Sequence, residues 1–198
     1  MGFPKNAIRT VMVASSLFAA AAPRLVAQVR YTRDDVRFMQ SMIAHHAQAL
    51  TMAALIVNRT ERPELLSLGE RIAVSQRDEI AAMQRWLTLR HEVVPRPDAA
   101  HPHDAASMTG IYMPGMLSEA EMMDLEEAKG EAFERRFLAG MIKHHEGAIA
   151  MVRELFHSPG AGQESEIFRF ASDVEADQRA EIARMRLLLD KLPKSANP

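Results

Sequence analysis

The sequence contains no cysteine, and this absence removes several classes of protein from consideration. Without thiols the chain can form no disulfide, no cysteine-ligated zinc site, no iron–sulfur cluster and no catalytic thiolate. Aromatic residues make up only 6% of the chain, and the formal net charge of −2, with interleaved signs, offers no basic surface for nucleic acid. The chain is instead rich in side chains that bind metal ions, with 14 methionines and 8 histidines among 198 residues.

The N-terminal 27 residues have the features of a secretory signal peptide. Lys5 and Arg9 precede the apolar stretch "TVMVASSLFAAAA", which has a suitable length for a signal and is short for a membrane span of about 20 residues. Cleavage near Ala20–Ala22 or Ala27 would leave a single exported domain, residues 28–198. Because the chain has no cysteine for lipid attachment, we expect a secreted or periplasmic protein that leaves the membrane after cleavage.

Apolar periodicity and capping motifs predict four long helices and no strands. The predicted helices cover residues 33–58, 63–90, 118–156 and 164–192. Thr32 and Asp35 form a capping-box pattern, Ser118 begins another, and Pro63 suits a first helical turn. The proline-rich segment at about 91–117 has no sustained period and is predicted to be a long crossover loop.

The two halves of the chain repeat one another. "FMQSMIAHHAQALTM" (38–52) aligns with "FLAGMIKHHEGAIAM" (137–151), and "QRDEIAAM" (76–83) aligns with "QRAEIARM" (178–185). Two similar helical hairpins joined by a long crossover predict an all-α four-helix bundle with pseudo-twofold symmetry. That symmetry places the two helices that carry His-His pairs either side by side or diagonally.

Histidine and methionine share one face of the first helix of each repeat. At about 100° per residue, Met42, His45, His46 and Met52 fall within an arc of about 140°. The second repeat has the same arrangement at Met141, His144, His145 and Met151.

The second helix of each repeat adds a carboxylate to this interior. Glu79 shares a face with Gln76 and Met83, and the equivalent residues of the second repeat are Gln178, Glu181 and Met185. The bundle is therefore expected to enclose imidazoles and thioethers, with Glu79 and Glu181 available as hydrogen-bond partners of the imidazoles.

The paired histidines favour a metal site over simple packing. A single methionine usually fills a core and a single histidine usually makes an internal hydrogen bond, but four buried imidazoles all require partners. Met42 and Met141 stand three residues before a histidine, where carboxylate-bridged di-iron bundles carry glutamate. A soft thioether in place of a hard carboxylate favours Cu(I), or Ag(I), over iron and zinc.

The crossover holds a second set of candidate ligands. Met113 and Met116 lie in "MTGIYMPGM", close to the histidines of "HPHD" (101–104). Methionines in a loop are harder to explain as core packing than methionines on a helix face. They can bind metal or simply dock on the bundle.

These motifs carry a resemblance to a known family. The stretch "MPGMLSEAEMMDLEEAKGEAFERRFLAGMIKHHEGAIAM" resembles the bacterial family catalogued as domain of unknown function 305, and the resemblance covers about residues 33–192. It implies a ferritin-like four-helix bundle, usually secreted, with some members that bind copper or silver in the periplasm. Leu138 stands where the first repeat has Met39, so the half-sites are expected to differ. The implied ligands are Met42, His45, His46, Met52, Met141, His144, His145 and Met151, with Met113 and Met116 as further candidates.

The sequence thus predicts an exported copper-binding protein that is not an enzyme. It would sequester Cu(I), or pass it to other copper-handling exported proteins. Two alternatives stay open: a metal-dependent redox enzyme, and a structural or protein-binding bundle in which the His-His pairs make internal hydrogen bonds. The oligomeric state is not indicated by the sequence.

Overall fold

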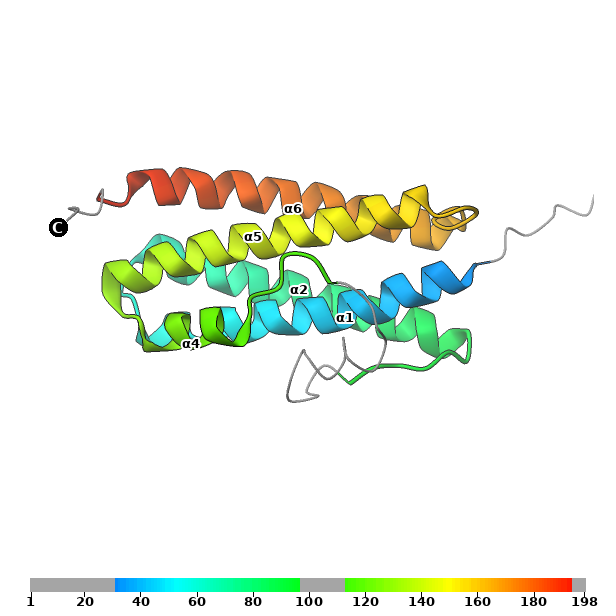
Figure 1. Ribbon diagram of the computed structural model, residues 1–198, viewed down its shortest axis with the longest axis horizontal. Coiled ribbons are helices and arrows are strands. Elements are labelled where there is room, and N and C mark those ends of the chain that lie inside the picture. The colour runs from blue at the N-terminus through cyan, green and yellow to red at the C-terminus, as the bar shows by residue number, and fades with distance from the viewer. Residues whose placement is uncertain (1–30, 97–112, 194–198) are drawn as a thin grey trace, which may run out of the picture.

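The computed structural model describes residues 31–96 and 113–193, and within these ranges it contains helices and no strands. Four long helices form an antiparallel bundle, and a short helix, α4, lies outside it beside α5 (Figure 1). The predicted all-α four-helix bundle is confirmed. The signal peptide at 1–27 and the "HPHD" part of the crossover lie outside the described residues. The helices are α1 (Arg33–Ala54), α2 (Pro63–Leu89), α4 (Glu119–Glu127), α5 (Gly130–His157) and α6 (Ser165–Lys191), with a 3₁₀ turn, η1, at Ile56–Asn58.

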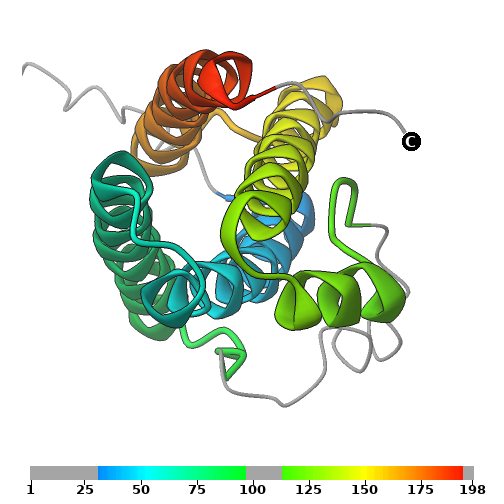
Figure 2. The same cartoon turned by 90° about the vertical axis from the view of Figure 1, so that its left-hand side faces the viewer.

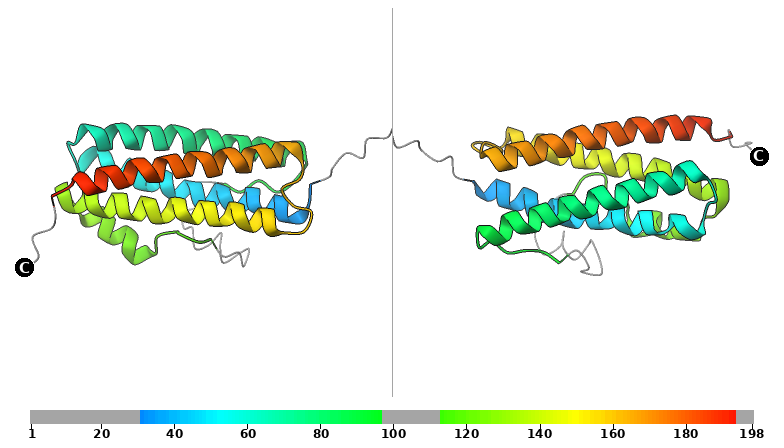
Figure 3. Two further views of the ribbon diagram at one scale, coloured as in Figure 1. Left: turned by 90° about the horizontal axis from the view of Figure 1, so that it is seen from above. Right: turned by 180° about the vertical axis from the view of Figure 1, so that it is seen from behind.

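The two hairpins, α1–α2 and α5–α6, pack through their first helices. The closest helix pairs are α1–α2, α5–α6 and α1–α5. Seen end-on, α1 lies between α2 and α5, and α6 closes the ring (Figure 2). From above and from behind, α6 runs alongside α5, and α2 alongside α1 (Figure 3). The His-His helices are therefore side by side and antiparallel. No helix in the described part of the chain is long and apolar enough to cross a bilayer.

The predicted capping motifs begin two of the helices. The Thr32 hydroxyl accepts a hydrogen bond from the Asp35 N–H at 3.2 Å, and the Asp35 carboxylate accepts one from the Thr32 N–H at 2.6 Å. Ser118 and Glu121 form the same reciprocal pair at the start of α4. These bonds satisfy N–H groups that the first helical turn leaves without intrahelical partners.

The prediction of one continuous helix over 118–156 was wrong, because residues 128 and 129 are not helical and separate α4 from α5. Gly130 adopts a left-handed φ of +54°, and its N–H donates to the carbonyl of Arg59 at 2.7 Å. The Arg59 guanidinium donates to the carbonyl of Glu126, the next-to-last residue of α4. The break is therefore held by the turn after α1. Such a long-range contact leaves little trace in local periodicity.

Candidate metal centre

The four paired histidines meet where α1 and α5 pack together. The ring centroids of His45 and His144 lie 3.8 Å apart, with an angle of 37° between the ring planes. His46 and His145 flank them, with centroids 6.3 and 6.1 Å from their chain neighbours. All four imidazoles are buried. The pseudo-twofold symmetry of the repeats thus gathers the histidines into one cluster.

The outer two histidines are held by carboxylates. His46 Nε2 lies 2.5 Å from Glu79 Oε2, and His145 Nε2 lies 2.6 Å from Glu181 Oε2. The expectation that these two glutamates could partner the imidazoles is confirmed. Each pair joins the two helices of one hairpin.

The inner two histidines are held by backbone carbonyls. His45 Nε2 lies 3.0 Å from the carbonyl oxygen of Pro114, and His144 Nε2 lies 2.9 Å from the carbonyl oxygen of His45. Because a carbonyl oxygen can only accept, both Nε2 atoms must carry the hydrogen. Burial lowers the pKa of His45 to about 3 and that of His144 well below 6.5, so both rings are neutral at pH 7. Their Nδ1 atoms consequently present unprotonated lone pairs.

The same tautomer follows for His46 and His145 when they are neutral, since an ionised carboxylate also only accepts. Within the described residues, the Nδ1 atoms of all four histidines are buried and have no hydrogen-bond partner. The side-chain amides of Gln76 and Gln178 share this condition. Each lies one helical turn before a glutamate that binds histidine. These six side chains account for every buried side-chain nitrogen or oxygen that lacks a partner in the described residues.

Histidine, glutamate and glutamine form a polar layer across the bundle, with an apolar cluster on each side. On α1, for example, Met42 belongs to one cluster and Ala49 to the other, with His45 and His46 between them. The order along the chain is the same on α6 and is reversed on α2 and α5, which run antiparallel to α1. We call the cluster that contains Met42 the first core cluster and the one that contains Ala49 the second core cluster.

Methionines from the two repeats mix in these clusters. Met42 and Met52 are ten residues apart, about 15 Å along α1, and therefore lie on opposite sides of the polar layer. Met42 shares the first core cluster with Met151, and Met52 shares the second with Met141. The methionines of one repeat thus do not gather around their own histidines. This crossing follows from the antiparallel packing of α1 and α5.

The clusters differ in their remaining methionines. Met39 and Met83 complete the first core cluster, whereas Met185 and Leu138 occupy the equivalent places in the second. All four side chains are buried. The inequivalence expected from Leu138 therefore persists in the assembled core.

The crossover segment, residues 113–117, docks against α1 and α5. Gln48 donates its side-chain N–H to the Leu117 carbonyl at 2.9 Å and accepts from the Leu117 N–H at 2.8 Å. A Cβ added at Gly147 would lie 1.9 Å from the Pro114 oxygen, so only glycine permits this approach of two backbones. Gln48 and Gly147 occupy equivalent positions in the two repeats. In the aligned repeats, this difference between glutamine and glycine is the sequence feature from which the docking of the crossover could have been predicted.

Met113 and Met116 lie in this docked segment and are half-buried. Pro114, between them, supplies the carbonyl that binds His45. The crossover methionines therefore flank the backbone group that covers the histidine cluster.

The described residues contain no group of three or more His, Asp or Glu side chains placed to hold a metal ion. A site of three or more such side chains is thus not formed there, and the thioether sulfurs of the core are the soft donors that remain beside the Nδ1 atoms. Acidic groups nonetheless surround the layer. The pKa of the Asp177 carboxyl is raised, first by partial burial and then by the charges of Glu79 and Glu181. Such a concentration of carboxylates favours cations.

Comparison with known proteins agrees with this architecture. Residues 35–189 match the family described as Domain of unknown function (DUF305). The chain belongs to this family. One curated relative, Uncharacterized protein L153 of Acanthamoeba polyphaga mimivirus, is 42% identical over 57 residues, which span 29% of this chain and 38% of that protein.

Several solved structures share the fold. A DUF305 fragment from Deinococcus radiodurans is 34% identical, with a TM-score of 0.68 over 82% of this chain and 99% of its own. A DUF305 protein of Streptomyces coelicolor, named as a candidate secreted protein, is 28% identical, with a TM-score of 0.68 over 80% and 93%. CopM in its Cu(I)-bound form is 26% identical, with a TM-score of 0.60 over 81% and 97%. CopM has also been solved with Cu(II) and with Ag.

Proposed function

We propose that this protein binds Cu(I), and Ag(I) by the same chemistry, as cargo in its polar layer. The observation that carries the proposal is the set of four buried Nδ1 atoms without a hydrogen-bond partner in the described residues, two of them on rings held neutral by burial. A neutral imidazole whose other nitrogen donates to a carboxylate or carbonyl is the usual state of a metal-binding histidine. The copper- and silver-bound forms of CopM support the proposal.

The methionines supply the soft donors that select a monovalent ion. Met42 and Met151 lie in the first core cluster, on one side of the polar layer, and Met52 and Met141 lie in the second, on the other side. Imidazole with thioether suits Cu(I). We therefore expect two soft half-sites, one on each side of the polar layer, each with sulfur from both repeats.

The carboxylates lower the cost of placing a cation in this interior. A buried positive charge is unfavourable unless it is paired. Glu79 and Glu181 reach the layer through their hydrogen bonds to His46 and His145, so the bound ion would face two nearby negative charges.

A purely structural role, without metal, explains the unpartnered polar atoms of this layer less well. In a purely structural network, buried polar groups are hydrogen-bonded, and exceptions call for an explanation. Here Gln76 and Gln178 are buried with both amide atoms unpartnered within the described residues, beside the four Nδ1 atoms. We infer a sequestration or transfer role outside the cytoplasm, because the signal-like N-terminus and the candidate secreted relative both support export.

Anaerobic titration with Cu(I) against a chromophoric chelator tests the proposal, on protein that lacks residues 1–27. We expect M42L/M151L and M52L/M141L each to lose about half of the tightly bound copper, since leucine keeps the volume and removes the sulfur. M113L/M116L is the matched control, because it makes the same change at two methionines of the crossover, outside the core clusters, and it should keep the tightly bound copper. Failure of the parent protein to compete for Cu(I) would mean that the histidine pairs are architecture.

A second variant separates the lone pairs from the hydrogen bonds. In H46Q/H145Q the glutamine amide can still donate to Glu79 and Glu181, but the Nδ1 lone pairs are gone. Loss of outer partners typically lowers metal affinity about 10–100-fold, so loss of the ligands themselves should lower it by at least that much. Unchanged Cu(I) affinity in this variant would exclude the histidines as ligands.

A further inference from the structure

The four imidazoles of the polar layer differ in what covers their Nε2 edge. The Nε2 atoms of His46 and His145 face glutamates of α2 and α6, and that of His144 faces the backbone of α1. These three edges are therefore covered by the long helices of the bundle. The Nε2 atom of His45 instead faces the carbonyl of Pro114, which belongs to the crossover segment. One histidine of the four is thus covered by a loop and not by a helix.

Few bonds hold the crossover segment on the bundle. Among the described residues, its backbone makes no backbone–backbone hydrogen bond to any helix. Its hydrogen bonds are the one from His45 and the two that Gln48 makes with Leu117. Loops with few buried contacts and few backbone bonds open at a lower free-energy cost than the helices of a core. The segment can therefore leave the bundle while the four long helices stay folded.

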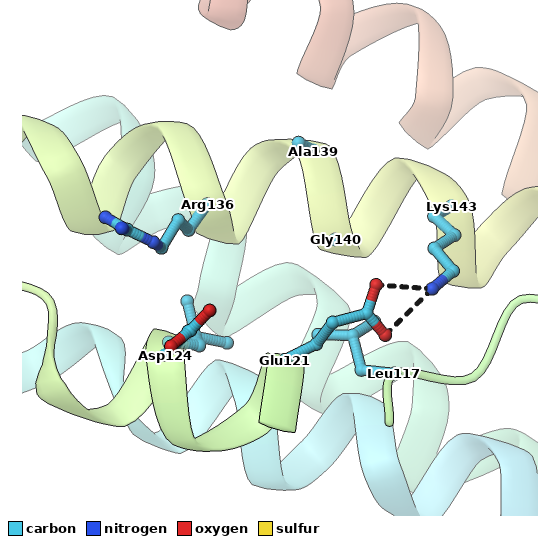
Figure 4. A pocket seen from close by; sticks show the side chains of 8 residues that line it. Leu117, Glu121, Asp124, Arg136, Ala139, Gly140 and Lys143 are labelled. Atoms are coloured by element: carbon cyan, nitrogen blue, oxygen red, sulfur yellow. Dashed lines mark hydrogen bonds and ion pairs between the residues drawn. The ribbon is translucent and has the colours of Figure 1, made fainter. Parts of the chain in front are cut away.

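The Leu117 side chain is the apolar anchor of the segment and is buried in the second core cluster. It also borders a cavity of about 250 Å³ between α4 and α5, so it is not packed on every side (Figure 4). Beside it, both carboxylate oxygens of Glu121 accept from Lys143 Nζ, at 2.7 and 2.9 Å, and hold the start of α4 on α5. The helix cap at Ser118, where α4 begins, thus gives the segment a fixed hinge.

The docked position of the segment is nevertheless specific. Gly115 and Gly147 allow the two backbones to touch, and a Cβ on either glycine would collide with backbone atoms of the other side. A segment that lifts would therefore return to the same place and accept again from His45. A loop that fits in one position but is held by few bonds has the properties of a lid.

We propose that the crossover segment is the gate of the polar layer. Cu(I) enters when the segment lifts off α1 and α5, and docking of the segment closes the layer behind it. Lifting exposes the Nε2 edge of His45 to water. There the neutral ring can lose its Nε2 proton and take one at Nδ1, so that Nε2 offers a lone pair to the ion while the ring stays neutral. The proposal rests on the proposed Cu(I) function and adds how the site opens.

Two measurements on the same variants test the gate. The Leu117 N–H donates to Gln48 in the docked state, so its hydrogen exchange reports opening of the segment without any copper. Stopped-flow transfer of Cu(I) from a bicinchoninate complex reports loading. We expect Q48A, which removes both bonds to Leu117, to speed exchange and loading by about tenfold. Because the gate must open for release as well as for uptake, loss of copper to a chelator should speed up equally, and the affinity should stay the same.

Two further variants make the outcome decisive. G147A displaces the segment by a backbone collision and should also speed loading, which keeps the test valid if Q48A does not fold. T51A removes a hydrogen bond within α1, one turn beyond Gln48, and should change neither rate.

Three results would overturn the gate. A Leu117 N–H that exchanges only with global unfolding would show that the segment does not lift by itself. Loading at the parental rate in variants whose Leu117 N–H exchanges faster would show that copper enters elsewhere. Both of these results leave the copper function standing, whereas a parent protein that takes up no Cu(I) would overturn the function and the gate together.

Discussion

Replacement of Gly147 by alanine should undock the crossover segment from the bundle. The added Cβ would lie 1.9 Å from the Pro114 oxygen and 2.7 Å from Gly115 Cα, and both are backbone atoms that cannot rotate away. The segment must therefore move off α5. It would take with it the carbonyl that accepts from His45.

The magnitude follows from what the docked segment contributes. Undocking exposes the buried Leu117 side chain, which is worth about 2 kcal/mol. It also breaks the His45 bond and both Gln48 bonds, at about 1 kcal/mol each. Freed backbone and the higher helix propensity of alanine recover part of this loss. After this recovery is set against the lost contacts, we expect G147A to lower the free energy of unfolding by about 2–3 kcal/mol.

Urea unfolding of G147A beside G140A gives a matched comparison. Both positions lie inside α5, two turns apart, and both gain the same helix propensity from alanine. At Gly140 the new methyl group meets only side-chain ends, so G140A should stay within about 1 kcal/mol of the parent. If G147A proves as stable as G140A, the backbone contact with Pro114 does not hold the segment.

Three further outcomes are expected for the metal-free protein. Since burial lowers the pKa of His45 and His144 below 6.5, the unfolded chain binds protons that the folded state does not, and stability should fall as pH drops from 6.5 toward 3. Over the first pH unit below 6.5, the free energy of unfolding measured by urea titration should fall by about 1 kcal/mol per histidine. His45→Gln should remove about half of this pH dependence. Asp35→Ala should cost about 2–3 kcal/mol in the same assay, because the buried carboxylate caps α1 and accepts the N–H of the turn before α6. Asp34 is half-buried and pairs only with Arg37 at the helix surface, so Asp34→Ala should change stability by less than about 0.5 kcal/mol, and a loss equal to that of Asp35→Ala would contradict this reading. His46→Ala should cost about 2–4 kcal/mol by leaving its carboxylate partner unpaired, whereas His46→Gln should cost clearly less; similar losses would show that packing dominates.

Local patterns predicted those features that depend on short stretches of chain. The capping box at Thr32 and the partnership of Glu79 with His46 follow from helical spacing and from the inner faces it defines. Pro63 and Ser118 likewise begin α2 and α4 as predicted.

Features that depend on how helices meet were not predictable in this way. Met42 joins Met151 rather than Met52 because α1 and α5 pack antiparallel, which helical spacing within a single repeat does not specify. The break before Gly130 depends on Arg59, and the cover over His45 depends on Pro114; both partners are far away in sequence. The sequence therefore indicated which residues are inside the bundle, but not which of them lie together.

The mixing of methionines across the repeats has an evolutionary consequence. Neither hairpin alone contains a complete cluster, so an ancestral single hairpin would have needed a second copy to assemble one. A symmetric dimer of that ancestor would have held two identical clusters, and any change would have altered both. Fusion of two copies in one chain frees each cluster to vary by itself. Leu138 opposite Met39, and Gly147 opposite Gln48, are differences of this kind, which a homodimer could not have kept.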